Sequence, residues 1–447
     1  MLTMKRVPTM VSMNQEQSCG RNCLGNCCLP GATFPLYTFG RRNTLLRRSE
    51  DQVQHPPTNP GGPSAEETSL LDSLILSKWE DCNERGLFRY DVTLCETKIL
   101  EGEYGFVAQL NEGRHSKKRP TEFRVDKVLQ PFDPNKFNFT KVGQEEVLFR
   151  FEESADGVID YFDNAPVEGS SPNVLVINVS PIEYGHILLV PRVMDCIPQR
   201  IDPDTLLLAL HLTAEVNNVN FRVGYNSLGA FATINQLHFQ AYYLEATFPL
   251  ERAPTTFVCY PRGEGGVKVS QVVNYPVRTL VFEIGSSLEE LADEVARACM
   301  ILQDANIPYN MLIADRGAKI FVIPQCFAER QAKGEVDQVI LDIRVNPAVW
   351  EISGHIILFR REDFEMATED YAWKLLAEGS LSADRFEEVK SMYLLLPEER
   401  LMAHCSADVF EDDSVNVAYR NIGKVKAKVR KSMELQSLHQ ECILPRA

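Results

Sequence analysis

Short runs of β-branched and aliphatic residues fill the middle of the chain and predict a sheet. Val174–Ile177 and Ile187–Val190 are two such runs, joined by a turn-forming stretch, and this arrangement is typical of adjacent antiparallel strands. Two more runs, Phe221–Tyr225 and Phe231–Tyr243, follow after an interval long enough for a helix. Together these segments predict an α+β fold built on an antiparallel sheet with helices.

Apolar residues at helical spacing predict helices on both sides of these strands. Asp202 or Asp204 is placed to cap a helix through Leu206–Val216, and Glu66–Arg85 has an amphipathic pattern that needs a partner surface. Further helices are predicted towards the C-terminus, over residues 370–378, 383–395 and, as a basic segment, 424–440.

A weaker second copy of the first hairpin follows about 135 residues later. Asn173–Val176 and Ile187–Pro191 are matched by Asn310–Ile313 and Ile320–Pro324, each pair in the order Asn-x-Leu-aliphatic, turn, Ile-x-x-aliphatic-Pro. Ser287–Glu290 has the form of a capping box and starts a predicted helix before the second hairpin. We interpret the pattern as a degenerate tandem duplication; chance similarity of two apolar hairpins is the alternative.

Breaks in composition divide the chain into four predicted regions. Residues 1–65 are expected to be an irregular segment ending in a Pro/Gly linker, and residues 66–250 form the half that carries the candidate chemistry. Residues 251–360 are the degenerate half, and residues 361–447 are a helical C-terminal region.

Composition excludes some classes of protein. A net charge of −16 argues against a general nucleic-acid binder, which needs a basic footprint. No apolar run is long enough to span a membrane, and no secretory leader is recognised, so a reducing cytoplasmic location is expected, with the cysteines as thiols. The basic pairs at residues 41–42 and 47–48 and the run 424–431 leave nuclear import as a second location.

The segment Thr233–Tyr243 carries the candidate chemistry. In a strand, alternate side chains share a face, so Gln236, His238 and Gln240 are expected to point one way while apolar neighbours face a core. A neutral imidazole can attack phosphorus with one nitrogen when the other donates its proton to a fixed acceptor such as a backbone carbonyl. A hydrogen-bonded structural histidine is the alternative.

Gln240 can donate N–H to a phosphoryl oxygen but cannot supply a proton. A nucleotidyl-imidazole on His238 would therefore last long enough to meet a second acceptor. The preceding loop contains Asn226, Ser227 and Gly229, which could bind phosphate or ribose through side-chain donors and a close backbone approach. A plain hairpin turn is the alternative for this loop.

These motifs resemble the transferase branch of the histidine-triad superfamily. The run Tyr184–Pro191 (YGHILLVP), followed about forty residues later by His-x-Gln, is similar to that of the galactose-1-phosphate uridylyltransferases. The wider text is more similar to the GDP-L-galactose phosphorylases of the plant ascorbate pathway, in stretches that cover nearly the whole chain: residues 86–93, 111–115, 119–123, 137–142 and 228–243.

The resemblance implies an enzyme that converts GDP-L-galactose and inorganic phosphate to L-galactose 1-phosphate and GDP. It implies that His238 accepts the guanylyl group, that Gln240 is the transferase glutamine, and that His186 is the further histidine near the reacting phosphate. It implies no cofactor. The residues do not indicate an oligomeric state.

One position departs from the family pattern, because Gln236 stands where the family has histidine. In metal-containing uridylyltransferases that histidine can serve a metal, so no metal is expected here. Gln236 could still bind substrate through a hydrogen bond. Alternatively, it weakens catalysis and leaves a regulator that binds nucleotide sugars. A phosphorylase of another GDP-hexose, such as GDP-D-glucose, is a third interpretation.

Two further clusters have alternative explanations. Arg114 leads a basic run, 114–119, that either covers the diphosphate or is a solvated loop, and Arg114 is retained as a candidate substrate-binding residue. Cys19, Cys23, Cys27 and Cys28 have imperfect spacing for a structural zinc site.

Overall fold

The computed structural model describes residues 32–40, 68–117, 123–169 and 171–394. The chain divides into two compact units, Met1–Val389 and Lys390–Ala447. The N-terminal cysteines, the basic segments at 41–48 and 424–431, and the predicted helix over 424–440 lie outside the described residues. Among the described residues, no helix has the length and apolar character needed to cross a membrane.

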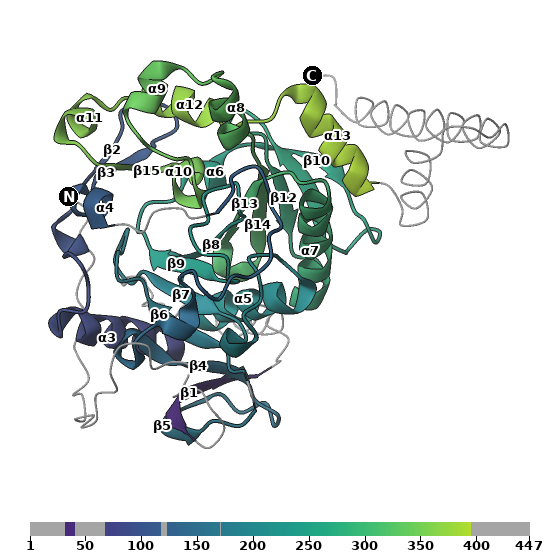
Figure 1. Cartoon of the computed structure of the whole chain (residues 1–447). Coiled ribbons are helices and arrows are strands. Elements are labelled where there is room, and N and C mark those ends of the chain that lie inside the picture. Colours follow the sequence, from purple (N-terminus) through teal and green to yellow (C-terminus); the bar gives the residue numbers. More distant parts are fainter. Residues whose placement is uncertain (1–31, 41–67, 118–122, 170, 395–447) are drawn as a thin grey trace, which may run out of the picture. The chain divides into compact units, whose positions relative to one another are not determined.

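A large mixed sheet organises the first unit (Figure 1). Its strand order over the described residues is β10-β11-β12-β14-β13-β8-β9-β7-β6-β4-β1-β5. Neighbouring strands are antiparallel, except that β1 runs parallel to β4. The bounds are β1 Thr33–Phe39, β4 Val147–Glu153, β5 Asp160–Pro166, β6 Val174–Ile177, β7 Ile187–Val190, β8 Phe221–Asn226, β9 Phe239–Tyr243, β10 Thr255–Cys259, β11 Lys268–Val272, β12 Leu280–Glu283, β13 Tyr309–Ala314 and β14 Lys319–Pro324.

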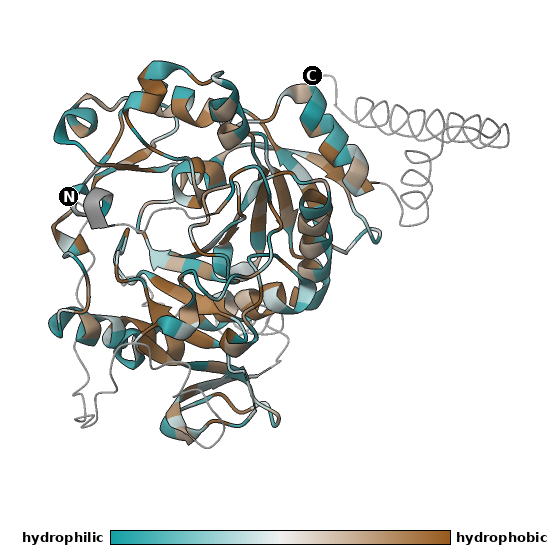
Figure 2. Ribbon diagram, in the orientation of Figure 1, coloured by the Kyte–Doolittle hydropathy of each residue, from teal (hydrophilic) through white to brown (hydrophobic). Residues whose placement is uncertain are grey.

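Three long helices pack in a row against this sheet: α3 (Leu70–Glu84), α5 (Pro203–Val216) and α7 (Leu288–Asp304). Helices α3 and α5 were expected from the apolar spacing and α7 from its capping box. Asp202 is the residue that caps α5, accepting a hydrogen bond from Thr205 N–H. The central strands are strongly apolar (Figure 2), because helices cover one side of them and other elements cover the opposite side.

A smaller sheet, in the order β15-β3-β2, belongs to the same unit. It consists of β2 (Glu96–Ile99), β3 (Val107–Leu110) and β15 (His355–Leu358), with β3 and β15 parallel. One apolar cluster contains side chains of this sheet, of the large sheet and of α10 (Val349–Ser353). The remaining helices are α4 Glu112–Lys117, α6 Pro249–Arg252, α8 Phe327–Lys333, α9 Gln338–Asp342, α11 Arg361–Met366, α12 Glu369–Ala377 and α13 Ala383–Leu394.

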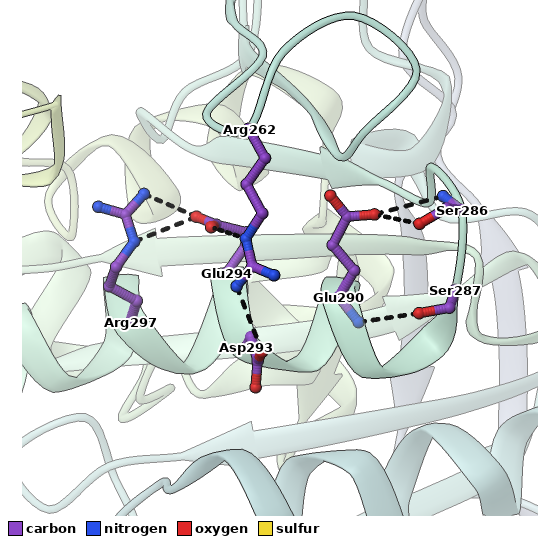
Figure 3. A network of polar contacts seen from close by, with 7 residues as sticks. All are labelled: Arg262, Ser286, Ser287, Glu290, Asp293, Glu294 and Arg297. Atoms are coloured by element: carbon purple, nitrogen blue, oxygen red, sulfur yellow. Dashed lines mark hydrogen bonds and ion pairs between the residues drawn. The ribbon is translucent and has the colours of Figure 1, made fainter.

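Helix α7 begins as the sequence predicts, with Ser287 accepting a hydrogen bond from Glu290 N–H at 3.1 Å. The Glu290 carboxylate reaches back one residue further than in a standard capping box, to the backbone N–H and hydroxyl of Ser286 (Figure 3). Farther along the helix, Glu294 accepts from both Arg262 and Arg297, and Arg262 also pairs with Asp293 (Figure 3). This network ties the segment after β10 to the outside of α7.

The topology contains a repeat, but not the one expected from the matched hairpins. β8 and β13 meet at the centre, and on either side the order β8-β9-β7-β6 faces β13-β14-β12-β11. The equivalent units are thus β7-α5-β8-β9 and β12-α7-β13-β14. The prediction that β6 and β7 correspond to β13 and β14 is wrong, because short apolar runs of similar composition occur at different places in each half.

Two other predictions need correction. The predicted irregular segment 1–65 contains β1, whose Tyr37 and Phe39 are buried next to β4. The predicted strand Phe231–Tyr243 is a strand only from Phe239 onwards, and residues 231–238 form turns and bends. Polar and apolar residues alternate over 231–238 as they do in a strand. Side chains, and not a neighbouring strand, supply hydrogen bonds to the backbone there. The four domain boundaries remain a prediction.

Candidate active site

His238 lies directly before β9 and is buried, with 5% of its surface exposed. Its Nδ1 is 2.7 Å from the backbone carbonyl oxygen of Gln236, so Nδ1 carries the proton and donates it. Nε2 therefore has a free lone pair. This is the arrangement that the sequence analysis required of a nucleophile, although the residue stands at the end of a turn and not within a strand.

Burial lowers the pKa of His238 to about 4, and the hydrogen bond to the Gln236 carbonyl, which by itself raises the pKa, offsets only part of this shift. The imidazole is therefore neutral at physiological pH. The Phe139 ring packs against it at a centroid distance of 5.1 Å and an angle of 57°. Phe139 opens the short helical turn η2 (Phe139–Lys141).

Gln199 holds the backbone of His238, a role that was not expected from the sequence. Its Oε1 accepts from His238 N–H at 3.0 Å, and its Nε2 donates to the carbonyl oxygens of Asn226, at 2.8 Å, and His238, at 3.3 Å. In the register of β8 and β9, Asn226 lies opposite His238, and the Gln199 carboxamide stands between them. Only the pairing of distant strands gives Gln199 this role, so the local sequence carries no signal for it.

Gln236 is fully buried, and both polar atoms of its side chain bond to backbone. Oε1 accepts from Phe139 N–H at 2.7 Å, and Nε2 donates to the carbonyl oxygen of Val193 at 2.8 Å. Val193 begins a second short turn, η4 (Val193–Asp195). The carboxamide predicted to bind substrate is thus engaged within the protein.

Gln240 is in β9, paired with Leu188 of β7 on one side and Gly224 of β8 on the other. Its side chain is half-buried, in contrast to its buried strand neighbours. Because strand residues two apart share a face, Gln240 and the buried Tyr242 lie on the side opposite Ala241. Gln240 therefore lies at the same end of the strand as His238.

His186 precedes β7 and is fully buried. Its Nδ1 accepts from Ile182 N–H at 2.9 Å, so the proton of the neutral ring is on Nε2. Burial and the positive charge of Arg114 lower the pKa of His186 well below its usual range, while a hydrogen bond with Gln240 acts in the opposite direction. The structure thus brings His186, Gln240 and Arg114 together.

The turn before His186 depends on glycine. Gly185 has a φ of +68°, and a Cβ there would lie 2.5 Å from the Tyr243 ring. On the preceding strand end, Asn178 Nδ2 lies 3.2 Å from His186 Nε2, while its Oδ1 accepts from Ser180 N–H. Asn178 is half-buried and directly follows β6. It was not among the residues expected from the sequence, although an Asn two residues before a serine at a strand end is a typical turn signal.

Arg114, in α4, is buried and donates to the carbonyl oxygen of Ser180. Ser180 lies in the loop between β6 and β7, which also contains Glu183. The Glu183 carboxylate accepts from Gln109 Nε2 at 3.1 Å. Removal from water raises the pKa of Glu183 to about 7, against the hydrogen bonds from Tyr184 N–H and Gln109. The loop between β6 and β7 therefore holds the Arg114 guanidinium through the Ser180 carbonyl and itself carries a readily protonated carboxyl.

The predicted binding loop has structural contacts instead of open donors. Asn226 Oδ1 accepts from Asn310 Nδ2 at 2.6 Å and from Val349 N–H at 2.9 Å. Ser227 Oγ accepts from Tyr309 N–H at 2.9 Å. Gly229 has a φ of +81°, and a Cβ there would lie 2.7 Å from the Val125 carbonyl oxygen. Asn226 and Ser227 connect the end of β8 to the second half, Gly229 lies against the Val125 backbone, and the role of all three towards substrate stays a prediction.

Among the described residues, no group of three or more His, Cys, Asp and Glu side chains could hold a metal ion.

Two family models match the chain: "GDPGP1-like, N-terminal domain" over residues 70–242 and "GDPGP1-like, C-terminal domain" over residues 249–398. GDP-L-galactose phosphorylase 1 of Arabidopsis thaliana is 58% identical over 400 residues, which cover 88% of each chain. GDP-L-galactose phosphorylase 2 of the same plant is 56% identical, over 88% of this chain and 90% of the relative.

GDP-D-glucose phosphorylase 1 of Homo sapiens is 34% identical over 81% of this chain and 92% of the relative. Among solved structures, yeast Ap4A phosphorylase Apa2 has 16% sequence identity and a TM-score of 0.46, over 70% of this chain and 98% of that one. A likeness of that size carries no argument about function.

Proposed function

This chain belongs to the GDPGP1-like family, and we propose that it is a GDP-L-galactose phosphorylase, which converts GDP-L-galactose and inorganic phosphate to L-galactose 1-phosphate and GDP. The proposal rests on plant relatives of that name that match along most of their length. The reaction is a transfer of the guanylyl group from a sugar phosphate to phosphate.

In the first step, Nε2 of His238 attacks the α-phosphorus of the substrate. The bond from this phosphorus to the bridging oxygen breaks, and L-galactose 1-phosphate leaves with the bond's electron pair. A guanylyl group remains on the imidazole. The observation that carries this step is the 2.7 Å bond from Nδ1 to the Gln236 carbonyl, which fixes the tautomer and leaves the lone pair of Nε2 for the phosphorus.

In the second step, an oxygen of inorganic phosphate attacks the same phosphorus and the bond to Nε2 breaks. GDP forms, and His238 returns to its neutral state. Because Gln240 donates N–H but carries no titratable proton, it stabilises the charged phosphoryl oxygens without protonating a leaving group. His186 would donate from Nε2 towards the Gln240 carboxamide oxygen, so that the NH₂ group of Gln240 faces the phosphate.

Arg114 supports both steps as a source of positive charge beside His186. A buried guanidinium attracts an anion more strongly than an exposed one, because less water screens it. The proposal assigns it to phosphate binding and not to proton transfer, since a guanidinium keeps its proton.

The test is to incubate the enzyme with GDP-L-galactose in the absence of phosphate. Intact-mass analysis should find one guanylyl group on the protein, and mild acid should remove it, as it removes phosphoramidates. A His238→Asn protein is the control and should remain unmodified. Turnover without any adduct, when phosphate is supplied, would reject the two-step mechanism.

A second substrate has its own support, because the human relative is named for GDP-D-glucose. Phosphorolysis of GDP-L-galactose, GDP-D-glucose and GDP-D-mannose, compared by kcat/KM, separates these possibilities. If GDP-D-glucose is strongly preferred, the sugar assignment changes and the chemistry does not. The weakened-regulator hypothesis fails if the wild-type rate equals that of Gln236→His.

A further inference from the structure

The catalytic imidazole stands at a gap in the sheet. β8 and β9 pair directly at Gly224 and Gln240, but two residues further along Asn226 and His238 are joined through the side chain of Gln199. The Gln199 carboxamide bonds both the N–H and the carbonyl of His238, as a neighbouring strand would. The side chain itself is 1% exposed, so water does not compete for these bonds.

A second carboxamide controls the ring from the other side. Gln236 joins the turns η2 and η4 by accepting from Phe139 N–H and donating to the Val193 carbonyl. The first bond holds the backbone of Phe139, whose ring lies against the imidazole. The two bonds together fix the backbone of Gln236, whose carbonyl receives the Nδ1 proton.

We propose that the side chains of Gln199 and Gln236 are positioning residues that fix the line of attack of His238, Gln199 by holding its backbone and Gln236 by holding its ring. The inference rests on the proposed function, in which Nε2 of His238 is the nucleophile. Neither carboxamide touches substrate in this account. Each acts through His238 alone.

Both positions need a group that donates and accepts at once. A carboxamide does so through separate atoms, and neither atom changes its protonation state at any ordinary pH. A neutral imidazole can also donate from one nitrogen and accept at the other, so Gln236→His can keep both bonds, to Phe139 N–H and to the Val193 carbonyl. Methionine has a similar size but offers neither a donor nor a strong acceptor.

The test measures the single-turnover rate of His238 guanylylation together with the steady-state KM for GDP-L-galactose. Gln199→Met and Gln236→Met should each lower the guanylylation rate about 10- to 100-fold, because small misplacements of reacting groups have effects of that size. KM should change by less than about threefold, since substrate contacts remain. Gln236→His should restore most of the rate lost in Gln236→Met.

The matched control is Gln303→Met. Gln303 is also a buried glutamine whose side chain holds backbone, accepting from Ile201 N–H and donating to the Ile201 carbonyl, but it has no contact with His238. This variant should lose stability and keep the guanylylation rate of the remaining folded protein. If Gln199→Met does not fold, Gln199→Glu, which keeps the acceptor for His238 N–H, takes its place.

Three outcomes would overturn the inference: an unchanged rate in both Gln199→Met and Gln236→Met, a rise in KM with no loss of rate, or no recovery in Gln236→His. A rise in KM would return Gln236 to the role of a substrate-binding residue. These results differ from a failure of the proposed function, in which the wild-type protein itself forms no guanylyl adduct.

Discussion

The two halves of the large sheet share a topology but differ in what lies on the face opposite the long helices. In the first half, β9 brings a half-buried Gln240 to that face, next to His238. In the second half, the equivalent strand β14 is buried along its length after Lys319, and Phe321 and Ile323 lie in the large apolar cluster. The same framework therefore supports the candidate reactive surface in one half and a packed core in the other.

The difference shows what the chemistry requires of the framework. A reactive strand end needs polar side chains that are held within the protein yet reachable, whereas a core strand needs apolar side chains without gaps. The second half contributes by support, because Asn310 of β13 donates to Asn226 of β8, directly beside the Gln199 contact.

The sharpest way to test this comparison is to remove the candidate nucleophile. His238→Asn should lower phosphorolysis about 10⁴-fold or more, as loss of a covalent nucleophile does in other enzymes. Lys319→Gln, at the start of the equivalent strand β14, should leave the rate within about twofold. Steady-state assays of both proteins measure the contrast, which disappears if Lys319→Gln is also inactive.

Gln240→Ala should have the next largest effect, about 10²-fold on kcat, since removal of one donor to a developing oxyanion has effects of that size. The thermal midpoint should change little because the side chain is half-buried. Stopped-flow or quench measurements of guanylylation give the rate. An unchanged kcat would remove Gln240 from the transition state and weaken the assignment of this face as reactive.

Acid should affect catalysis only well below neutral pH. With the pKa of His238 lowered to about 4, Nε2 keeps its lone pair at pH 5, so the titration of His238 should leave the guanylylation rate level from pH 8 to about 5 and lower it below that. An unshifted histidine would already lose rate below its usual pKa of 6.5. Quench-flow measurements across this range distinguish the two.

The same burial affects stability. The folded-state pKa of His238 lies below the unfolded value of 6.5, so the unfolded chain takes up a proton first as the pH falls. The free energy of unfolding should therefore decrease between pH 6.5 and about 4, and denaturant titrations should show it. His238→Asn should reduce that dependence, which separates this contribution from those of His186 and His355.

The smallest expected effect belongs to the outer surface of the second half. Arg262→Ala removes ion pairs with Asp293 and Glu294 at the outside of α7. The arginine is half-exposed, so the loss should be about 0.5–1 kcal/mol, with kcat unchanged. Denaturant unfolding and a standard assay measure both. A drop in kcat would mean that the halves are coupled through α7 as well as through Asn226 and Asn310.

The sequence was a good guide where a signal was local. Asp202 and Ser287 cap helices as predicted, and the runs of β6 and β7 pair as expected, because caps and apolar alternation depend on near neighbours. The hydrogen bond from His238 Nδ1 to a backbone carbonyl was also predicted and is present, while the role of His238 as the nucleophile stays a prediction. Both kinds of prediction use only a few consecutive residues.

The sequence was a poor guide where distant segments meet. Residues 231–238 alternate like a strand, yet the side chain of Gln199 bonds the backbone of His238, and the side chain of Gln236 bonds the backbone of Phe139 and Val193. Nothing near Gln199 indicates this, because its partners are 27 and 39 residues away. Asn226 and Ser227 looked like ligand donors for the same reason, since their partners in β13 and α10 could not be recognised locally.

The pairing of β8 with β13, and of β3 with β15, has a consequence for anyone who cuts this polypeptide. The two family models meet between residues 242 and 249, but both pairings cross that point. A fragment ending there would expose the hydrogen-bonding edge of β8 and leave β3 without its parallel neighbour, a state prone to aggregation. Mixed fragments could instead recover each other's strands, so this enzyme is better suited to split-protein complementation than to domain-by-domain expression.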